Sequence, residues 1–139
     1  MHPGPLLATL ALLIAGAAHA DIVVIVSTRN PVAALSASQA ADIFLGKFAF
    51  FPGGVQATPI DQSEGSPWRD EFYKKTSGKA PPQMLAYWTK MIFTGRGQPP
   101  IESGDNAAVR RLVADNPGLI GYIDRSMVDA SVKVVLTLH

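Results

Sequence analysis

The residues best suited to ligand chemistry form a short run of hydroxyl, acidic, glycine and arginine positions: Ser63, Glu64, Gly65, Ser66 and Arg69. Within this run, Ser66 followed by Pro67 is typical of a helix start, with serine as the cap and proline at the first position. The first N–H groups of a helix lack internal acceptors and carry partial positive charge. A preceding glycine lets the backbone approach an oxyanion, and hydroxyl groups add donors. The run therefore predicts an oxyanion site, with an ordinary helix cap, a turn glycine and a solvated arginine as the alternative.

Ser27 and Thr28 form a second group of donors. They end a run of β-branched residues, 21–27, that predicts a buried strand, and Arg29 follows them. Open α/β sheets bind ligands at the carboxyl ends of their strands. We therefore predict that Ser27 and Thr28 face the same crevice as the first group. A polar turn between strand and loop is the alternative.

Catalytic and metal-binding groups are sparse. A nucleophile at Ser66 would need a histidine base, and outside the leader described below only the terminal His139 remains. A zinc site would lack ligands, because the chain has no cysteine and few histidines. Asp61 and Glu64 could form a carboxylate pair, but no metal motif or partner base accompanies them. The sequence predicts a protein that is not an enzyme and has no metal or cofactor.

These groups must be positioned by an alternation of strands and helices. β-branched and apolar runs predict strands at 21–27, 57–61, 119–123 and 132–138. Apolar residues at helical spacing, with capping residues before them, predict helices at 35–47, 66–78, 81–95 and 105–115. Residues 96–104 are predicted to be a loop. The alternation predicts a single three-layer α/β/α domain around a mostly parallel, mixed sheet.

Residues 1–20 are predicted to be a cleavable export signal. Residues 6–18 are apolar and uncharged, and Ala18-His19-Ala20 is a small-x-small cleavage site. The apolar part is too short to span a bilayer, and a buried N-terminal helix is the alternative. Cleavage after Ala20 would leave one domain, 21–139, without cysteine for a disulfide or a lipid anchor. We expect a soluble periplasmic protein.

Charge composition bears on the partners of the chain. Twelve lysine and arginine residues nearly balance eleven aspartate and glutamate residues. Neither a basic stripe nor an aromatic platform for bases is present, which argues against a nucleic-acid partner. The loop at 48–54 carries Phe48, Phe50 and Phe51. These rings could form an exposed patch for a partner protein, or they could pack beneath the loop.

Three segments, in this order, resemble one known family: "LSASQAADIFLGK" at 35–47, "DQSEGSPWRDEF" at 61–72 and "NPGLIGYI" at 116–123. Together they look like the second lobe of the phosphate-binding proteins that serve ABC importers. The resemblance covers nearly all of the chain after the leader. It implies the fold of one lobe of a type II periplasmic binding protein.

In that family the ligand lies in a cleft between two lobes, held by a loop resembling D-G-S-G-T-R at a helix start. Gly65, Ser66 and Arg69 match this pattern, and Glu64 falls where the family has aspartate. The sequence departs from it where "PW" at 67–68 replaces glycine and threonine, which removes one N–H donor and one hydroxyl. The resemblance implies binding of phosphate or a related oxyanion, for an ABC-type import system. Without a second lobe the site would be open to water, so binding should be weaker.

A second interpretation belongs to another class of function. The altered loop, the absent lobe and the aromatic loop at 48–54 are also expected of a periplasmic interaction module that kept the lobe but lost tight anion binding. Its partner would be a membrane-embedded importer or a periplasmic protein. A homodimer could also rebuild a two-sided cleft from two copies.

Overall fold

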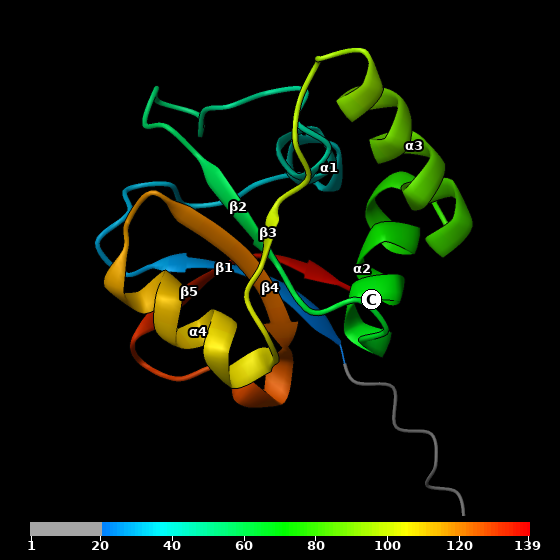
Figure 1. Cartoon of the computed structure of the whole chain (residues 1–139). Helices are drawn as coiled ribbons and strands as arrows, with labels where there is room; N and C mark the ends of the chain where they lie inside the picture. The colour runs from blue at the N-terminus through cyan, green and yellow to red at the C-terminus, as the bar shows by residue number, and fades with distance from the viewer. Residues whose placement is uncertain (1–20) are drawn as a thin grey trace, which may run out of the picture.

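The structure, a computed structural model, describes residues 21–139, so the predicted export signal lies outside the described residues. Strands and helices alternate along this part of the chain (Figure 1). In chain order they are β1 (Ile22–Ser27), α1 (Ala37–Phe44), β2 (Thr58–Asp61), α2 (Pro67–Ser77), α3 (Pro81–Phe93), β3 (Ile101–Glu102), α4 (Asn106–Asp115), β4 (Leu119–Asp124), the 3-10 turn η2 (Arg125–Met127) and β5 (Val132–Leu138). The predicted helices and the four predicted strands are all present, within a few residues of their expected bounds.

The strands form one five-stranded mixed sheet in the order β3-β2-β4-β1-β5. β2 is parallel to β3 and β4, whereas β1 is antiparallel to both of its neighbours, β4 and β5. Four strands therefore share one direction and β1 alone runs the other way, which confirms the mostly parallel, mixed sheet. The expected loop at 96–104 contains the short strand β3, whose two residues are too few to show an alternating pattern.

Helices cover both faces of the sheet, which confirms the three layers. On one face, Val109 and Val113 of α4 are buried against a cluster that includes Val23 and Ile25 of β1. On the other face lie α1 and α2, and the larger part of the core. Each fully buried aliphatic side chain contributes roughly 1.5–3 kcal/mol relative to exposure, so these two contact surfaces hold the layers together.

An aromatic cluster joins the helices to the middle of the sheet. The rings of Phe72 and Tyr122 are stacked with centroids 4.1 Å apart, and Phe44 meets Phe72 edge-on at 4.7 Å. Tyr73, the residue after Phe72, contacts the same group. Aromatic pairs contribute about 0.5–1.5 kcal/mol each beyond their burial. The cluster fixes α2 on β4 and so places the start of α2 beside the end of β2.

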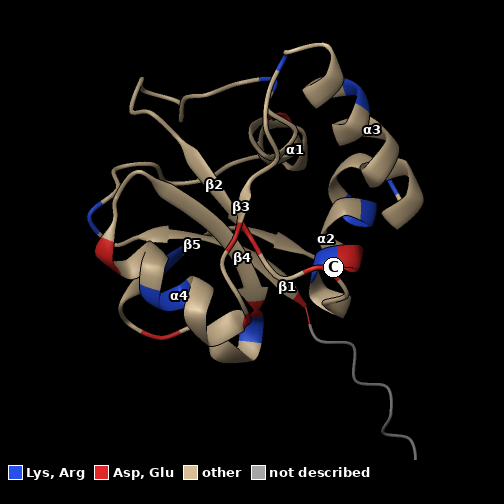
Figure 2. Cartoon of the chain, in the orientation of Figure 1, with Lys and Arg blue, Asp and Glu red and all other residues tan. Residues whose placement is uncertain are grey.

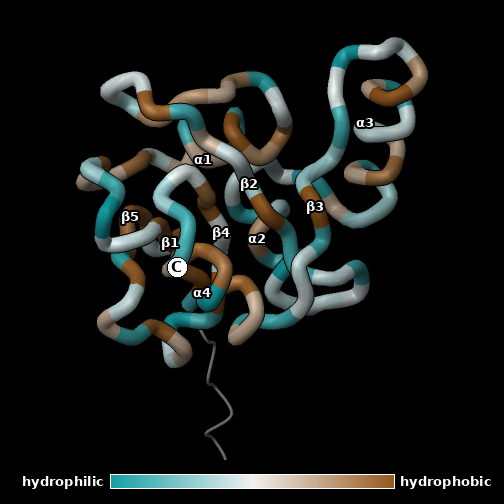
Figure 3. The backbone as a smooth tube through the Cα atoms, turned by 60° about the vertical axis from the view of Figure 1, so that its left-hand side comes forward, coloured by the Kyte–Doolittle hydropathy of each residue, from teal (hydrophilic) through white to brown (hydrophobic). Residues whose placement is uncertain are grey.

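α3 stands away from the sheet, as the views in Figure 1 and Figure 3 both show. Its buried residues are Met84 and Trp88, which face the main core. Hydrophobic positions on the rest of the helix remain exposed, among them Leu85 and Phe93. No helix between residues 21 and 139 has the length and apolar character needed to cross a bilayer.

Candidate anion-binding site

The predicted site lies at one edge of the sheet. Because β2, β3 and β4 are parallel, their last residues, Asp61, Glu102 and Asp124, all end at this edge. α2 begins at the same place, and Figure 2 shows acidic residues gathered where β2 and β3 end. The carboxyl ends of parallel strands are the usual place for ligands in open α/β sheets.

Asp61 is the buried centre of this edge. Its carboxylate accepts hydrogen bonds from the hydroxyl of Tyr73 at 2.7 Å, from the hydroxyl of Tyr122, and from the backbone N–H of Gln62 at 3.1 Å. Burial raises the pKa of Asp61 above its usual value, although the two tyrosine hydrogen bonds and the charge of Arg69 oppose the shift. Burial, together with the Asp61 charge, also raises the pKa of Tyr122, so this phenol stays a donor.

Arg69 is the cation of the site. Its Nε lies 3.4 Å from Oδ2 of Asp61, an ion pair whose geometry is not that of a hydrogen bond. The guanidinium carbon lies 6.0 Å from the centroid of the Tyr73 ring. Burial lowers the pKa of Arg69, but the electrostatic effects of Asp61, Tyr73, Tyr122 and Glu102 together outweigh it, and the net shift is upward. Arg69 is therefore charged, held from one side by Asp61, and exposed on the other to a groove.

Gln62 connects three elements at the edge. Its side-chain Nε2 donates to Oδ1 of Asn106 at 2.7 Å and to the carbonyl of Tyr122 at 3.0 Å, and its Oε1 accepts from Ser66 Oγ at 2.8 Å. Buried amides must find such partners, since each unsatisfied group costs about 1–3 kcal/mol. Gln62 therefore ties the start of α2 to β4 and to the start of α4.

Ser66 caps α2, as its position before Pro67 predicts. Its Oγ accepts from the backbone N–H of Arg69 at 3.3 Å and donates to Gln62 at 2.8 Å. The helix-cap interpretation is thus confirmed, and the hydroxyl proton is already in a hydrogen bond. A role for Ser66 in anion binding stays a prediction.

The loop before α2 holds the other predicted residues. Ser63 and Glu64 are exposed, and Gly65 has a φ of 92°, a left-handed conformation that favours glycine. The backbone N–H of Glu64 donates to Oε1 of Glu102 at 2.9 Å. A carboxylate of the protein itself therefore occupies one donor of the predicted oxyanion loop. The structure brings Ser63 through Arg69 together at one edge, beside this acid.

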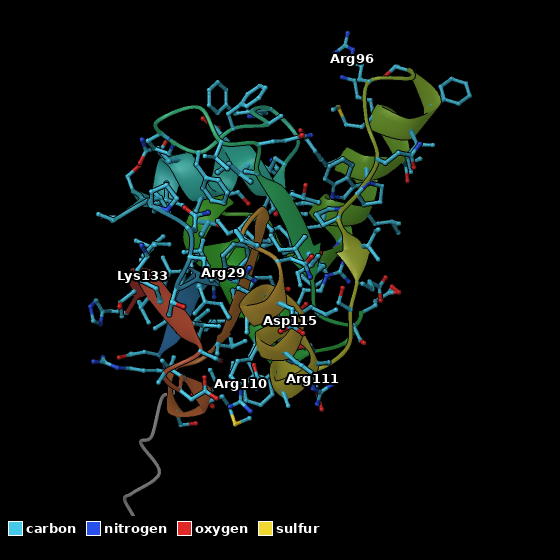
Figure 4. The ribbon with its side chains drawn as sticks, turned by 90° about the vertical axis from the view of Figure 1, so that its left-hand side faces the viewer. Arg29, Arg96, Arg110, Arg111, Asp115 and Lys133 are labelled. Atoms are coloured by element: carbon cyan, nitrogen blue, oxygen red, sulfur yellow. The ribbon has the colours of Figure 1, made fainter. Side chains whose placement is uncertain are left out.

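Ser27 and Thr28 lie elsewhere, and the prediction that they face the same crevice is wrong. Because β1 alone runs in the opposite direction, its carboxyl end lies at the other edge of the sheet. Ser27 is buried and donates to the carbonyl of Ala114 at 3.3 Å, near the end of α4, whereas the start of α4 contacts Gln62. A helix of this length spans about 15 Å. Arg29 binds the carbonyl of Asp115 at the same far end (Figure 4).

Five polar residues of the site were not predicted: Gln62, Tyr73, Glu102, Asn106 and Tyr122. Asn106 accepts from Gln62 and from the backbone N–H of Asp124 at 3.0 Å. Its place directly after the helix cap Asp105 puts it at the start of α4 but gives no signal of its contact with Gln62. Glu102 carries no signal either, because it lies in a proline-rich segment read as loop. Within residues 21–139, no group of three or more His, Cys, Asp or Glu side chains is arranged to hold a metal ion.

No protein-family model and no curated protein matches the sequence. Several solved structures do match this chain. One is named as a putative phosphate ABC transporter substrate-binding protein from Clostridium perfringens, with bound phosphate. Its TM-score is 0.65 and its sequence identity is 30%. The match covers 84% of this chain and 45% of the Clostridium protein. An ABC-type phosphate transport receptor from Vibrio cholerae has a TM-score of 0.63 and 20% identity over 84% of this chain and 46% of its own. PstS from Borrelia burgdorferi has a TM-score of 0.62 and 14% identity, over 84% and 47%.

The fold is thus that of an α/β lobe like those of substrate-binding proteins. More particularly, the fold is that of one lobe of the phosphate substrate-binding proteins of ABC transporters, which confirms the resemblance read from the sequence. The chain spans less than half the length of these solved relatives. The relatives are named as binding and transport proteins, not as enzymes.

Proposed function

We propose that this protein is exported to the periplasm and binds phosphate or a related oxyanion at the start of α2, in the service of an ABC-type import system. The solved relative with 30% identity contains bound phosphate, which supports this ligand class. The site residues proposed are Ser63, Glu64, Gly65, Ser66 and Arg69. Ser27 and Thr28 are not among them, since they lie at the other edge.

The orientation of Arg69 carries the proposal. Asp61 holds its Nε side at 3.4 Å, while the guanidinium lines a groove of about 430 Å³. No hydrogen bond joins its terminal nitrogens to another residue of the described chain, so they remain as charged donors for an incoming acceptor. Arginine suits oxyanions because its planar donors can bind two oxygens at once.

Binding is expected to be weak. The groove is open to solvent, which screens charged hydrogen bonds. An anion that uses the backbone N–H of Glu64 must also displace the carboxylate of Glu102, which accepts that bond at 2.9 Å. We therefore expect Glu102→Gln to bind the anion more tightly, because it removes a competing negative charge.

A thermal-shift titration tests the proposal, with phosphate, sulfate and molybdate against a chloride control at constant ionic strength. A ligand that binds only the folded protein stabilises it by about 2.7 kcal/mol at a hundredfold excess over Kd. We expect a saturable shift that Arg69→Ala removes. The matched control Arg111→Ala changes an exposed arginine of α4, on the other face, and should keep the shift. If Arg69→Ala and Ser66→Ala both bind as the wild type does, the site is wrong.

A non-transport interaction module is the second candidate, and one observation favours it. Phe48 and Phe50 are 57% and 47% exposed, and their rings pair edge-on with centroids 6.1 Å apart. Phe51, from the same loop, is buried. The loop therefore exposes two of its rings, as expected of a partner-binding patch, and packs the third beneath it. Two exposed phenylalanines side by side are typical of a surface that a partner covers. Absence of any anion-dependent shift, with retention of a partner on co-purification, would favour this candidate.

A further inference from the structure

A second feature of the groove is its apolar wall. The groove of about 430 Å³ lies between α3, the start of α2 and the segment before β3, and its wall comprises Met84, Leu85, Trp88, Ile92, Pro99 and Pro100. Leu85 and Ile92 are two helical turns apart and so lie on one face of α3. Leu85 is 71% exposed and Ile92 is 47% exposed. Contiguous apolar surface of this kind marks interaction sites in soluble proteins.

Trp88 adds a buried aromatic side chain to the wall. It lines the groove and is only 6% exposed, and its indole Nε1–H has no acceptor among the described residues. The nitrogen itself is buried, so this donor is not open to the groove.

The rim of the groove carries an excess of negative charge. Three carboxylates line it, those of Glu64, Asp70 and Glu102, against two cations, Arg69 and Lys79. The ammonium of Lys79 lies 5.5 Å from the centroid of the Tyr87 ring, a cation–π contact. Charge complementarity therefore favours an occupant with basic groups.

We propose that the α3 groove binds an extended segment of another polypeptide in which aliphatic or aromatic side chains alternate with lysine or arginine. The apolar side chains of such a segment cover Leu85 and Ile92, and its basic side chains meet the acidic rim. A second copy of this chain does not fit, because it would present the same acidic rim. An anionic membrane surface is repelled for the same reason. The proposal goes beyond anion binding and does not depend on it.

The test uses the fluorescence of Trp88. The chain has two tryptophans, so in Trp68→Phe only Trp88 emits. The probe is a short capped peptide in which leucine alternates with lysine. We expect a saturable change in Trp88 emission that weakens as salt is added. The same peptide with glutamate in place of lysine, and one with serine in place of leucine, should bind at least tenfold more weakly, a difference of about 1.4 kcal/mol.

Two variants test whether the peptide binds at the α3 groove. Leu85→Lys, in the Trp68→Phe background, should weaken peptide binding at least tenfold, since it removes apolar surface from the wall and adds a charge that repels the lysines of the peptide. Leu112→Lys is the matched control, because Leu112 is an exposed leucine on α4, on the other face of the sheet, and should bind as before. Both sites are exposed, so folding is preserved. Equal binding by Leu85→Lys, equal binding of the glutamate peptide, or no saturable change would overturn the proposal. The phosphate titration of Arg69→Ala is a separate measurement, so either proposal can be overturned while the other is retained.

Discussion

At the scale of single residues, the site depends on one buried acid. Asp61 accepts hydrogen bonds from Tyr73 and Tyr122 and pairs with Arg69, so the arrangement of the proposed anion-binding edge is centred on its carboxylate. The tyrosines belong to the aromatic cluster that holds α2 on β4. Position and packing are therefore coupled: the residue that orients Arg69 is fixed by core side chains, not by the loop.

We predict that Asp61→Asn changes how stability depends on pH. Because burial raises the pKa of Asp61 above 3.8, the folded protein holds this proton more tightly than the unfolded chain does. The stabilisation that the protonated Asp61 carboxyl gives the folded protein is complete below about pH 3.8. It is lost as the pH rises through the raised pKa, by at most about 1.4 kcal/mol of unfolding free energy per pH unit. Urea unfolding of both proteins across this range measures the difference. The wild type should lose stability relative to the variant as pH rises; a relative gain would contradict the assignment.

At the scale of elements, α4 lies unusually close to β4. A Cβ placed on Gly121 of β4 would lie 2.6 Å from Cγ1 of Val109 and 3.3 Å from Cγ2 of Val113. Both valines are fully buried and β-branched, so they cannot turn away freely. Glycine at this position permits the helix to approach the sheet, and that approach brings Asn106, the first residue of α4, to Gln62.

We therefore predict that Gly121→Ala destabilises the protein by about 1–3 kcal/mol, the usual cost of overpacking a core. Chemical denaturation followed by circular dichroism measures the change in the free energy of unfolding. Val109→Ala in the same background removes the clashing methyl groups and should recover part of the loss. If the double variant is less stable by the sum of both single changes, the clash with Val109 is not the cause.

At the scale of the whole molecule, the two ends of the described chain meet. Ile22 at the start of β1 pairs with Leu138 at the end of β5, so the chain enters and leaves the sheet side by side. β1 lies between β4 and β5 and is buried along its whole length. The first residue the sheet needs is therefore Ile22, directly after the predicted cleavage site and the following Asp21.

We predict that the mature protein begins at Asp21. Expression of the full chain in a bacterium, followed by intact mass measurement of the periplasmic fraction, should give the mass of residues 21–139. The fold should be unaffected by removal of the predicted leader, since the five-stranded sheet is formed within residues 21–139. Recovery of the uncleaved chain in a folded, cytoplasmic form would refute the export signal.

Local patterns in the sequence determined the helices, the longer strands and the cap of α2. Ser66-Pro67 and the apolar spacing of 105–115 act over a few residues, so they can be read without knowledge of the fold. The ordered segments at 35–47, 61–72 and 116–123 were sufficient to identify the lobe, and the solved relatives confirm it. The grouping of Ser63 through Arg69 followed from their closeness in the chain.

Only the tertiary structure decided what depends on strand direction and distant pairing. The reversal of β1 removed Ser27 and Thr28 from the site, and a strand's direction is set by the neighbours it pairs with, not by its own residues. Glu102 reaches Glu64 across 38 positions of sequence, and Gln62 reaches Asn106 across 44. Such contacts leave no periodic pattern in the sequence, because they form between groups that the sheet, and not the local chain, brings together.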